Sequence, residues 1–330
     1  MQRAGDPYRG QRRPHGRVRP APGWLGGCLL IARIATRLWG NAWLLLSCTA
    51  LFWSGNAIVG RAVVGLVPPA TLSFCRWSGA FCIVLGFAWK HLRADLDVIL
   101  RHWRLMLVFA LTGIACFNVM LYIGLTTTTA LNGVLMQSSQ PLIVILWAAL
   151  LRTEQPTWRQ MAGVVVSLSG VAVIAAHGNL AGLMRLQINA GDLWVLGGSL
   201  IYGLYVAILR RRPPMHPLSF IAVTFGLGAL MVMPLMLRER AAGLTVTGGA
   251  APWLGIFYTM VFPSLLAYLG FNRGVELIGP GRAGQATHLT PVFGTVLAVL
   301  LLGEVFHPFH AVGIALIGVG ILLASWRARQ

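Results

Sequence analysis

Two ionisable side chains in this 330-residue sequence stand inside long apolar segments, where they could act on a solute. Arg76 is one of them. A cation within a long apolar segment costs a few kcal/mol if that segment spans a membrane, and it usually faces a cavity or a partner. It could attract an anionic or carboxylate-bearing solute, or it could be a structural arginine that bonds backbone carbonyls or extends to the membrane interface. His288 is the other. It could respond to protons, because a histidine pKa can cross the physiological range, or it could be a neutral side chain that holds two helices together.

Further candidates are polar and aromatic side chains that recur at matching positions of two halves of the chain. Trp53 and Asn56 correspond to Tyr202 and Tyr205, 149 positions later. A cavity lined by aromatic rings and a few amides would bind a small amphipathic molecule, although aromatic residues at span ends are also ordinary interface anchors. The full set of cavity candidates is Trp53, Asn56, Arg76, Asn118, Tyr122, Gln137, Gln140, Tyr202, Tyr205, Tyr268, Asn272, Gln285 and His288.

Three prolines, Pro141, Pro263 and Pro291, interrupt apolar segments. A proline inside a helix frees a backbone carbonyl, so these positions could be hinges or solute contacts, or they could be static kinks.

Two carboxylates, Glu154 and Glu304, follow apolar segments and precede a helix. We expect them to be structural caps, because a carboxylate suits the positive N-terminus of a helix. All acidic residues fall in the N-terminal tail, in loops or at span ends. If the protein moves a solute together with protons, His288 or a carboxylate at a span end must carry the proton, and if it moves a solute without protons, it is a facilitator. The spacing of Glu304, His307 and His310 matches no standard ligand pattern, so we predict no metal and no cofactor.

The elements that must position these residues are apolar helices arranged as a duplication. Residues 130–174 align without a gap to residues 280–324, and Pro141, Glu154, Gly163 and Gly170 coincide with Pro291, Glu304, Gly313 and Gly320. The apolar runs are near 20 residues long, which suits membrane-spanning helices. We expect ten, at 40–60, 70–89, 105–124, 129–151, 158–176, 191–209, 218–237, 252–274, 280–302 and 308–326.

Composition supports an all-α integral membrane protein, since 57% of residues are hydrophobic, 10% are charged and the mean hydropathy is +0.73. Most Lys and Arg residues fall in the tail and in loops on one face, which places both termini in the cytoplasm and explains the net charge of +18 without nucleic acid. Five spans in each half would make the second half enter the membrane from the opposite side, as an inverted repeat.

The predicted organisation has five parts. Residues 1–39 form a basic tail that we expect to be disordered, 40–177 form the first five-helix repeat, 178–190 form a linker, 191–326 form the second repeat and 327–330 form a short C-terminal tail.

The stretch LFWSGNAIVGRAVVGLVPPATLSFCRW at 51–77 and the two P-x12-E-x8-G-x6-G blocks resemble the EamA family of the drug/metabolite transporter superfamily. The resemblance implies a bacterial inner-membrane transporter with ten helices, often an exporter of amino acids or other metabolites, with a central cavity between its two repeats. Phe225 occupies the position that matches Arg76, so any role of this arginine is asymmetric.

We therefore predict a secondary transporter of small metabolites that works by alternating access, with the lipid bilayer and a small-molecule substrate as its partners. The sequence lacks a G-x4-G-K-[ST] loop, so nothing in it indicates an ATP-driven pump. It also lacks the H-E-x-x-H and G-x-S-x-G motifs, which disfavours an enzyme acting on a lipid-linked substrate. A membrane subunit with no transport of its own is the remaining alternative, and the sequence does not define an oligomeric state.

Overall fold

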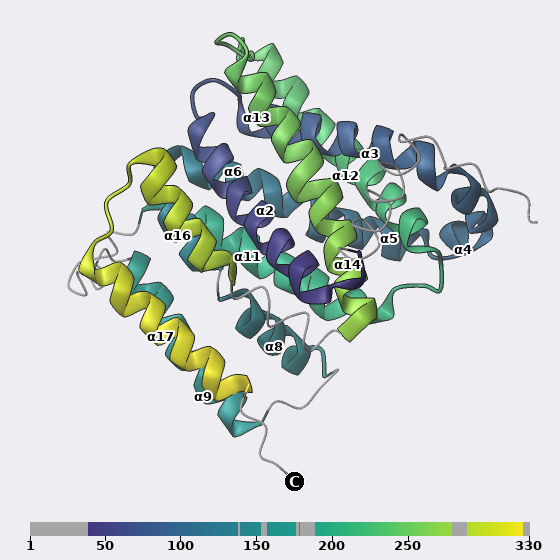
Figure 1. The fold of residues 1–330 in the computed structure, drawn as a ribbon. Coiled ribbons are helices and arrows are strands. Elements are labelled where there is room, and N and C mark those ends of the chain that lie inside the picture. The colour runs from purple at the N-terminus through teal and green to yellow at the C-terminus, as the bar shows by residue number, and fades with distance from the viewer. Residues whose placement is uncertain are drawn as a thin grey trace, which may run out of the picture. The chain divides into compact units, whose positions relative to one another are not determined.

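Long apolar runs of the chain form long helices in the computed structural model, which describes residues 39–137, 139–152, 157–175, 178, 189–278 and 289–325. Four of them are single α-helices, α2 (Ala42–Ala62), α3 (Pro69–Ala94), α11 (Ala190–Ile208) and α12 (Pro217–Ala241) (Figure 1). In α3 and α12 a proline occupies the first helical position, where its missing N–H leaves no bond unmade.

Two further long helices are composite, and each contains a π-helical segment. One consists of α5 (Trp103–Phe109), η1 (Ala110–Cys116) and α6 (Phe117–Thr127), and the other of α13 (Ala251–Thr259), η3 (Met260–Leu266) and α14 (Ala267–Ile278). The segments η1 and η3 occupy equivalent positions in the duplication, because their first residues are 150 positions apart. Such segments inside α-helices often occur at functional sites.

The remaining elements are shorter. They are α4 (Leu96–Arg101), α7 (Ala130–Gln137), α8 (Gln140–Leu150), α9 (Trp158–Ala175), η2 (Leu209–Arg211), α16 (Leu289–Leu302) and α17 (Pro308–Ser325). Pro141 is the second residue of α8, beside a 45° bend between α7 and α8, and Pro291 lies in the first turn of α16.

Six of the described helices are long and apolar enough to cross a membrane, or seven if α7 and α8 form one bent span. Three shorter apolar helices lie within α9, α16 and α17. The described residues thus show a multi-pass helical protein without strands, whereas the count of ten spans stays a prediction. The expected ninth span includes residues 280–288, which lie outside the described part.

The helices from Ala42 onward form one unit, in which elements of the two halves pair. Helix α17 packs along α9, and α12 packs along α3 (Figure 1). A Cβ at Gly170 would lie 2.7 Å from the carbonyl of Gly313, and one at Gly320 would lie 2.5 Å from that of Gly163. The duplication relates these two contacts to each other, because Gly170 corresponds to Gly320 and Gly313 corresponds to Gly163. Helices α9 and α17 are therefore antiparallel, related by a pseudo-two-fold axis, and held close by glycines that the repeat conserves between its copies.

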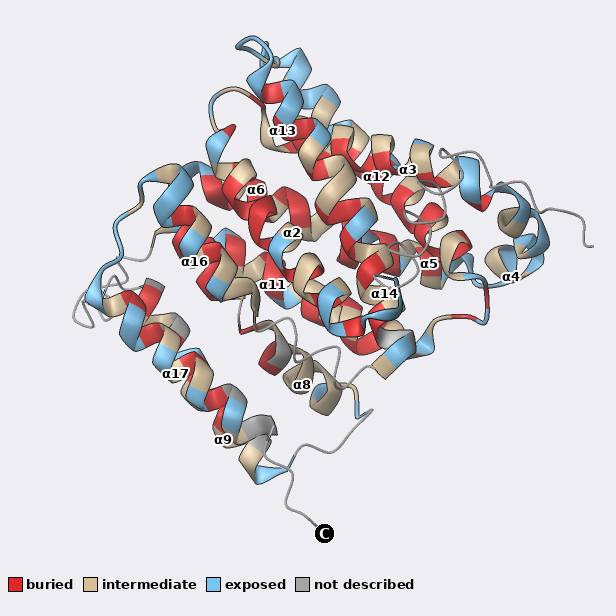
Figure 2. Ribbon diagram, viewed as in Figure 1, coloured by how far each residue is buried: buried red, intermediate tan, exposed pale blue. Residues whose placement is uncertain are grey.

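Buried residues are frequent along central helices such as α2, α6 and α11 (Figure 2). Leu72, Leu121, Leu125 and Leu131 are almost fully enclosed. Large apolar side chains on other faces of the helices are exposed, among them Phe87, Trp158 and Leu300 at 73–74%. A soluble protein seldom exposes so many, so these outer faces suit contact with lipid.

Candidate solute-binding site

Arg76 lies on the buried face of α3 together with Ser73, Trp77 and Ala80, and only 3% of its surface is exposed. All four of its hydrogen-bond acceptors are side-chain oxygens. Nε donates to Ser264 Oγ at 2.6 Å, and Nη1 lies near Asn56 Oδ1 at 2.7 Å, Asn118 Oδ1 at 2.7 Å and the Tyr122 hydroxyl at 2.9 Å. The guanidinium therefore joins α2, α3 and α6 of the first half to η3 of the second.

The partners of Arg76 are themselves held in place. Asn118 and Tyr122 are one turn apart on α6, so both side chains face the arginine. The Tyr122 hydroxyl donates to Asn56 Oδ1 at 2.7 Å, and Asn118 Nδ2 donates to the carbonyl of Ile114 at 3.3 Å. This assignment directs both amide oxygens toward the cation.

The charge of Arg76 is not neutralised by the described residues, because its acceptors are all uncharged and no carboxylate among them pairs with it. Its Nη2 makes no hydrogen bond to the described residues. The indole of Trp77 covers the guanidinium at 4.4 Å from Cζ to the ring centroid, a cation–π contact. Because burying an unpaired cation is costly, an anion placed at Nη2 would be bound favourably.

Aromatic side chains from both halves surround this cation. Trp77 contacts Phe225 and Tyr268 with ring centroids 4.7 and 6.3 Å apart, and Trp53 and Tyr268 form a T-shaped pair at 6.2 Å. Tyr202 packs on Tyr205 with ring centroids 5.4 Å apart, and the side chains of Tyr202 and Tyr268 lie close enough to influence each other. The aromatic residues at matching positions thus form one cluster beside Arg76.

Other candidate residues lie apart from this cluster or outside the described residues. Gln137 donates to the carbonyl of Gly133 in its own helix at 3.0 Å. Gln140 and Asn272 are half-buried and make no hydrogen bond to the Arg76 cluster. Gln285, His288 and Glu154 lie outside the described residues. The backbone carbonyl of Pro263, within η3, accepts a hydrogen bond from Trp53 Nε1 at 3.2 Å.

Glu304 caps a helix of the opposite half rather than the helix that follows it. Its two oxygens accept the backbone N–H groups of Ala130 at 2.9 Å and Leu131 at 2.8 Å, at the N-terminus of α7. Gly303 precedes it in the left-handed region, at φ 65°, which turns the chain after α16 so that the carboxylate reaches α7.

Two other carboxylates lie at helix N-termini. Glu239, near the end of α12, accepts hydrogen bonds from the backbone N–H groups of Ala70 and Thr71 and from the Thr71 hydroxyl, all within 2.8 Å. Asp192, in the first turn of α11, is fully buried and accepts a hydrogen bond from the Thr128 hydroxyl. Asp192 lies at a span end, as expected from the sequence for the acidic residues. The sequence did not indicate that it is completely buried.

Ser264 and Trp77 contact Arg76 but were absent from the sequence-derived candidates. Trp77 directly follows Arg76, and its position as an aromatic residue beside a cation within an apolar segment could have identified it as a candidate. Ser264 had a weaker one, since it follows Pro263 and replaces Ile114 of the first half.

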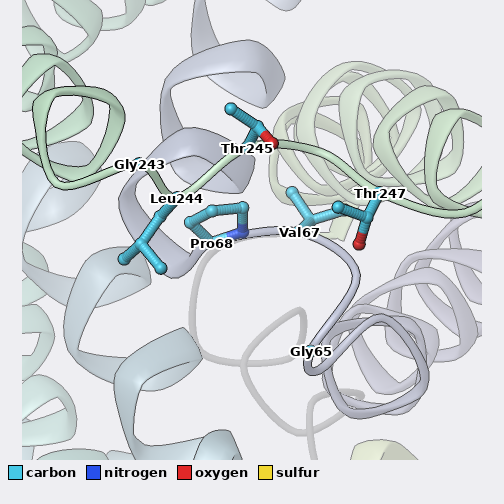
Figure 3. Close-up of a pocket in the computed structure, with 7 residues that line it drawn as sticks. All are labelled: Gly65, Val67, Pro68, Gly243, Leu244, Thr245 and Thr247. Atoms are coloured by element: carbon cyan, nitrogen blue, oxygen red, sulfur yellow. The ribbon is translucent and has the colours of Figure 1, made fainter.

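A pocket of about 250 Å³ lies away from this cluster, between the loop after α2 and the loop after α12 (Figure 3). It is lined by Gly65, Val67, Pro68, Gly243, Leu244, Thr245 and Thr247. The Thr247 N–H donates to the carbonyl of Leu66 at 2.9 Å, which joins the two loops. The pocket has no charged lining residue, so Arg76 offers the stronger chemistry for a solute. Among the described residues, no three His, Cys, Asp or Glu side chains gather to hold a metal.

Duplicated helices, lipid-suited outer faces and a buried polar cluster between the halves define a multi-pass α-helical membrane protein of the transporter type. The model of the EamA-like transporter family matches residues 38–176 and again 189–326, so the chain belongs to this family.

Several relatives extend over most of the chain. The uncharacterized transporter YyaM of Bacillus subtilis is 25% identical over 295 residues, which cover 86% of this chain and 93% of that protein. A probable terminal-alkyne amino-acid exporter of Streptantibioticus cattleyicolor is 27% identical over 221 residues, which cover 66% of this chain and 71% of that protein. One crystal structure superimposes with a TM-score of 0.59 at 20% identity over 86% of this chain and 96% of that one, which supports the fold alone.

Proposed function

We propose that the protein is a secondary transporter that exports amino acids or related small metabolites across a bacterial inner membrane by alternating access. In this proposal ten helices span the bilayer as two inverted repeats, and both termini are cytoplasmic. Family membership and a relative named as a probable amino-acid exporter support the class of solute.

The observation that carries the proposal is the unneutralised, buried cation of Arg76 between the two halves. A carboxylate at Nη2 would form a charge-assisted hydrogen bond and pair with a cation that otherwise has only neutral neighbours. The aromatic residues Trp53, Tyr202 and Tyr268 would then contact the apolar part of the same molecule.

The burial of this site supports a mechanism that changes conformation. Asn56, Arg76, Asn118 and Tyr122 are each no more than 6% exposed, so a solute from either side can reach them only if the halves rearrange. Two inverted halves can exchange conformations, and that exchange moves the opening from one side of the membrane to the other.

Proton coupling is part of the proposal, with His288 or a carboxylate at a helix end as the proton carrier, and facilitated diffusion is the alternative. A protonophore separates the two. It stops coupled export against a gradient, whereas a facilitator continues to equilibrate its solute.

The test is a metabolite profile of the medium from cells that express the intact protein, beside cells that express Arg76→Ala at the same membrane level. Ser78→Ala is the matched control, because the Ser78 hydroxyl bonds only carbonyls of its own helix, two residues from Arg76. We expect carboxylate-bearing compounds to accumulate with the intact protein and the control, and not with Arg76→Ala. Equal profiles in all three strains would refute the proposal.

A further inference from the structure

The contact between Arg76 and Ser264 has an apolar counterpart in the duplication. Arg76 corresponds to Phe225 in the second half, and Ser264 corresponds to Ile114 in the first. The pseudo-two-fold axis therefore relates the pair Arg76 and Ser264 to the pair Phe225 and Ile114, which belong to one buried apolar cluster. Both positions are polar where the arginine is present and apolar at the matching positions. The serine therefore occurs together with the arginine.

The local structure of η3 directs the Ser264 hydroxyl toward Arg76. Pro263 has no N–H, so it cannot bond the carbonyl of Thr259 four residues earlier. That carbonyl accepts the Ser264 hydroxyl at 2.8 Å. Because a hydroxyl has one hydrogen, Ser264 can meet the Arg76 Nε–H at 2.6 Å only as an acceptor.

A second contact ties the same segment to the first half, since Trp53 donates to the Pro263 carbonyl. Two side chains assigned to solute binding, Arg76 and Trp53, therefore hold adjacent residues of η3. A solute that displaces either side chain would alter how this interrupted helix is held.

We propose that Ser264 is the positioning residue for Arg76. It fixes the plane of the guanidinium through Nε, so that Nη1 points to Asn56, Asn118 and Tyr122 and Nη2 stays available for the solute. It also links solute binding to η3, the π-helical segment of the opposite half. The assignment of Nη2 to a solute rests on the proposed function, whereas the orientation of Arg76 by Ser264 does not.

The test is nuclear magnetic resonance of the full-length protein in detergent, with arginine labelled with ¹⁵N, because it needs no ligand. The Nε–H signal of Arg76 is assigned by its loss in Arg76→Lys. We expect Ser264→Ala to shift or broaden this signal, Ser264→Thr to restore it by returning a hydroxyl, and Ser78→Ala to leave it unchanged. An unchanged Arg76 signal in Ser264→Ala overturns the proposal. If Ser264→Ala does not fold, Ser264→Thr and Ser264→Cys decide it, since only the threonine should retain the signal.

A second readout uses L-leucine as the probe and L-leucinamide, which lacks the carboxylate, as its control, with binding followed by tryptophan fluorescence. Loss of one charge-assisted hydrogen bond should weaken L-leucine binding by roughly tenfold in Ser264→Ala, with recovery in Ser264→Thr. Wild-type affinity for L-leucine in Ser264→Ala would contradict the link to solute binding. If wild-type protein binds both probes equally or binds neither, the amino-acid class of the proposed function fails, while the nuclear magnetic resonance result still decides the positioning.

Discussion

Glu304 should stabilise a part of the protein that is remote in the sequence, because it caps a helix that begins 174 residues earlier in the chain. Replacing it with alanine leaves the N–H groups of Ala130 and Leu131 without an acceptor. These residues are 0% and 1% exposed, so water cannot readily take the place of the carboxylate. Each unsatisfied buried donor costs about 1–3 kcal/mol, which gives an upper range of about 6 kcal/mol for the pair. Glu304 itself is only half-buried, so some water should enter and we expect about 2–4 kcal/mol.

Glu304→Gln should fall between the wild type and Glu304→Ala. The amide keeps one acceptor oxygen, but its NH₂ group faces the second backbone donor. The assay is thermal unfolding of the purified protein in detergent. A loss of this size should lower the midpoint by about 5–10 °C in the alanine variant, by analogy with the scaling for soluble domains.

Asp97→Ala is the control for this series, because Asp97 is also a carboxylate at a helix N-terminus, but it is exposed in the first turn of α4. Its removal should shift the midpoint little. If Glu304→Ala unfolds at the wild-type temperature, or no lower than Asp97→Ala, then the cap does not contribute as its geometry indicates.

Three further predictions concern the ends and crossings of the paired helices. Glu239→Ala should cost about 1–2 kcal/mol, since it removes the cap of α3, and a midpoint equal to that of Asp97→Ala would exclude this role. Gly170→Leu should separate α9 from α17 and lower the unfolding midpoint by several degrees, whereas Gly318→Ala, where a Cβ meets nothing within 4 Å, should be tolerated; the reverse order would refute the close crossing. The Ser219 hydroxyl, then the His216 N–H and nearby histidine charges, hold the pKa of Asp95 below its ordinary value despite some burial. Its contribution is therefore present above the unfolded pKa of about 3.9 and is lost as pH falls through the lower folded value, so Asp95→Asn should flatten the dependence of the midpoint on pH below about 4; an unchanged slope would contradict it.

The repeat and the location of most described helices could be predicted because they depend on local patterns. Apolar runs near 20 residues mark helices, and the equal spacing of Pro141 and Pro291 marks the duplication whatever the fold. Arg76 was recognisable for a similar reason, since a cation within an apolar run is costly wherever the chain places it.

The partners of these residues could not be predicted, because they depend on packing between distant segments. Glu304 precedes α17 in the sequence, yet it caps α7, because the two halves interlock and the N-terminus of α7 lies beside the turn after α16. Ser264 is an ordinary residue in its own segment, and it acquires its role only because η3 packs against α3. The π-helical form of η1 and η3 was equally hidden, since η1 contains no proline and differs from η3 in sequence.

The contacts between α3 and α12 bear on which parts of the protein can move. Glu239, near the end of α12, caps the N-terminus of α3, and Asp95, just after the end of α3, accepts the His216 N–H at the N-terminus of α12 at 2.9 Å. Two antiparallel helices tied by carboxylates at both ends resist sliding and separation, because either motion would leave helix N-termini unsatisfied. The contacts of η3 with Arg76 and Trp53 are instead made by side chains that the proposed solute would also touch. In the proposed alternating access, we therefore expect α3 and α12 to move as one body and the rearrangement that opens the site to take place at η3.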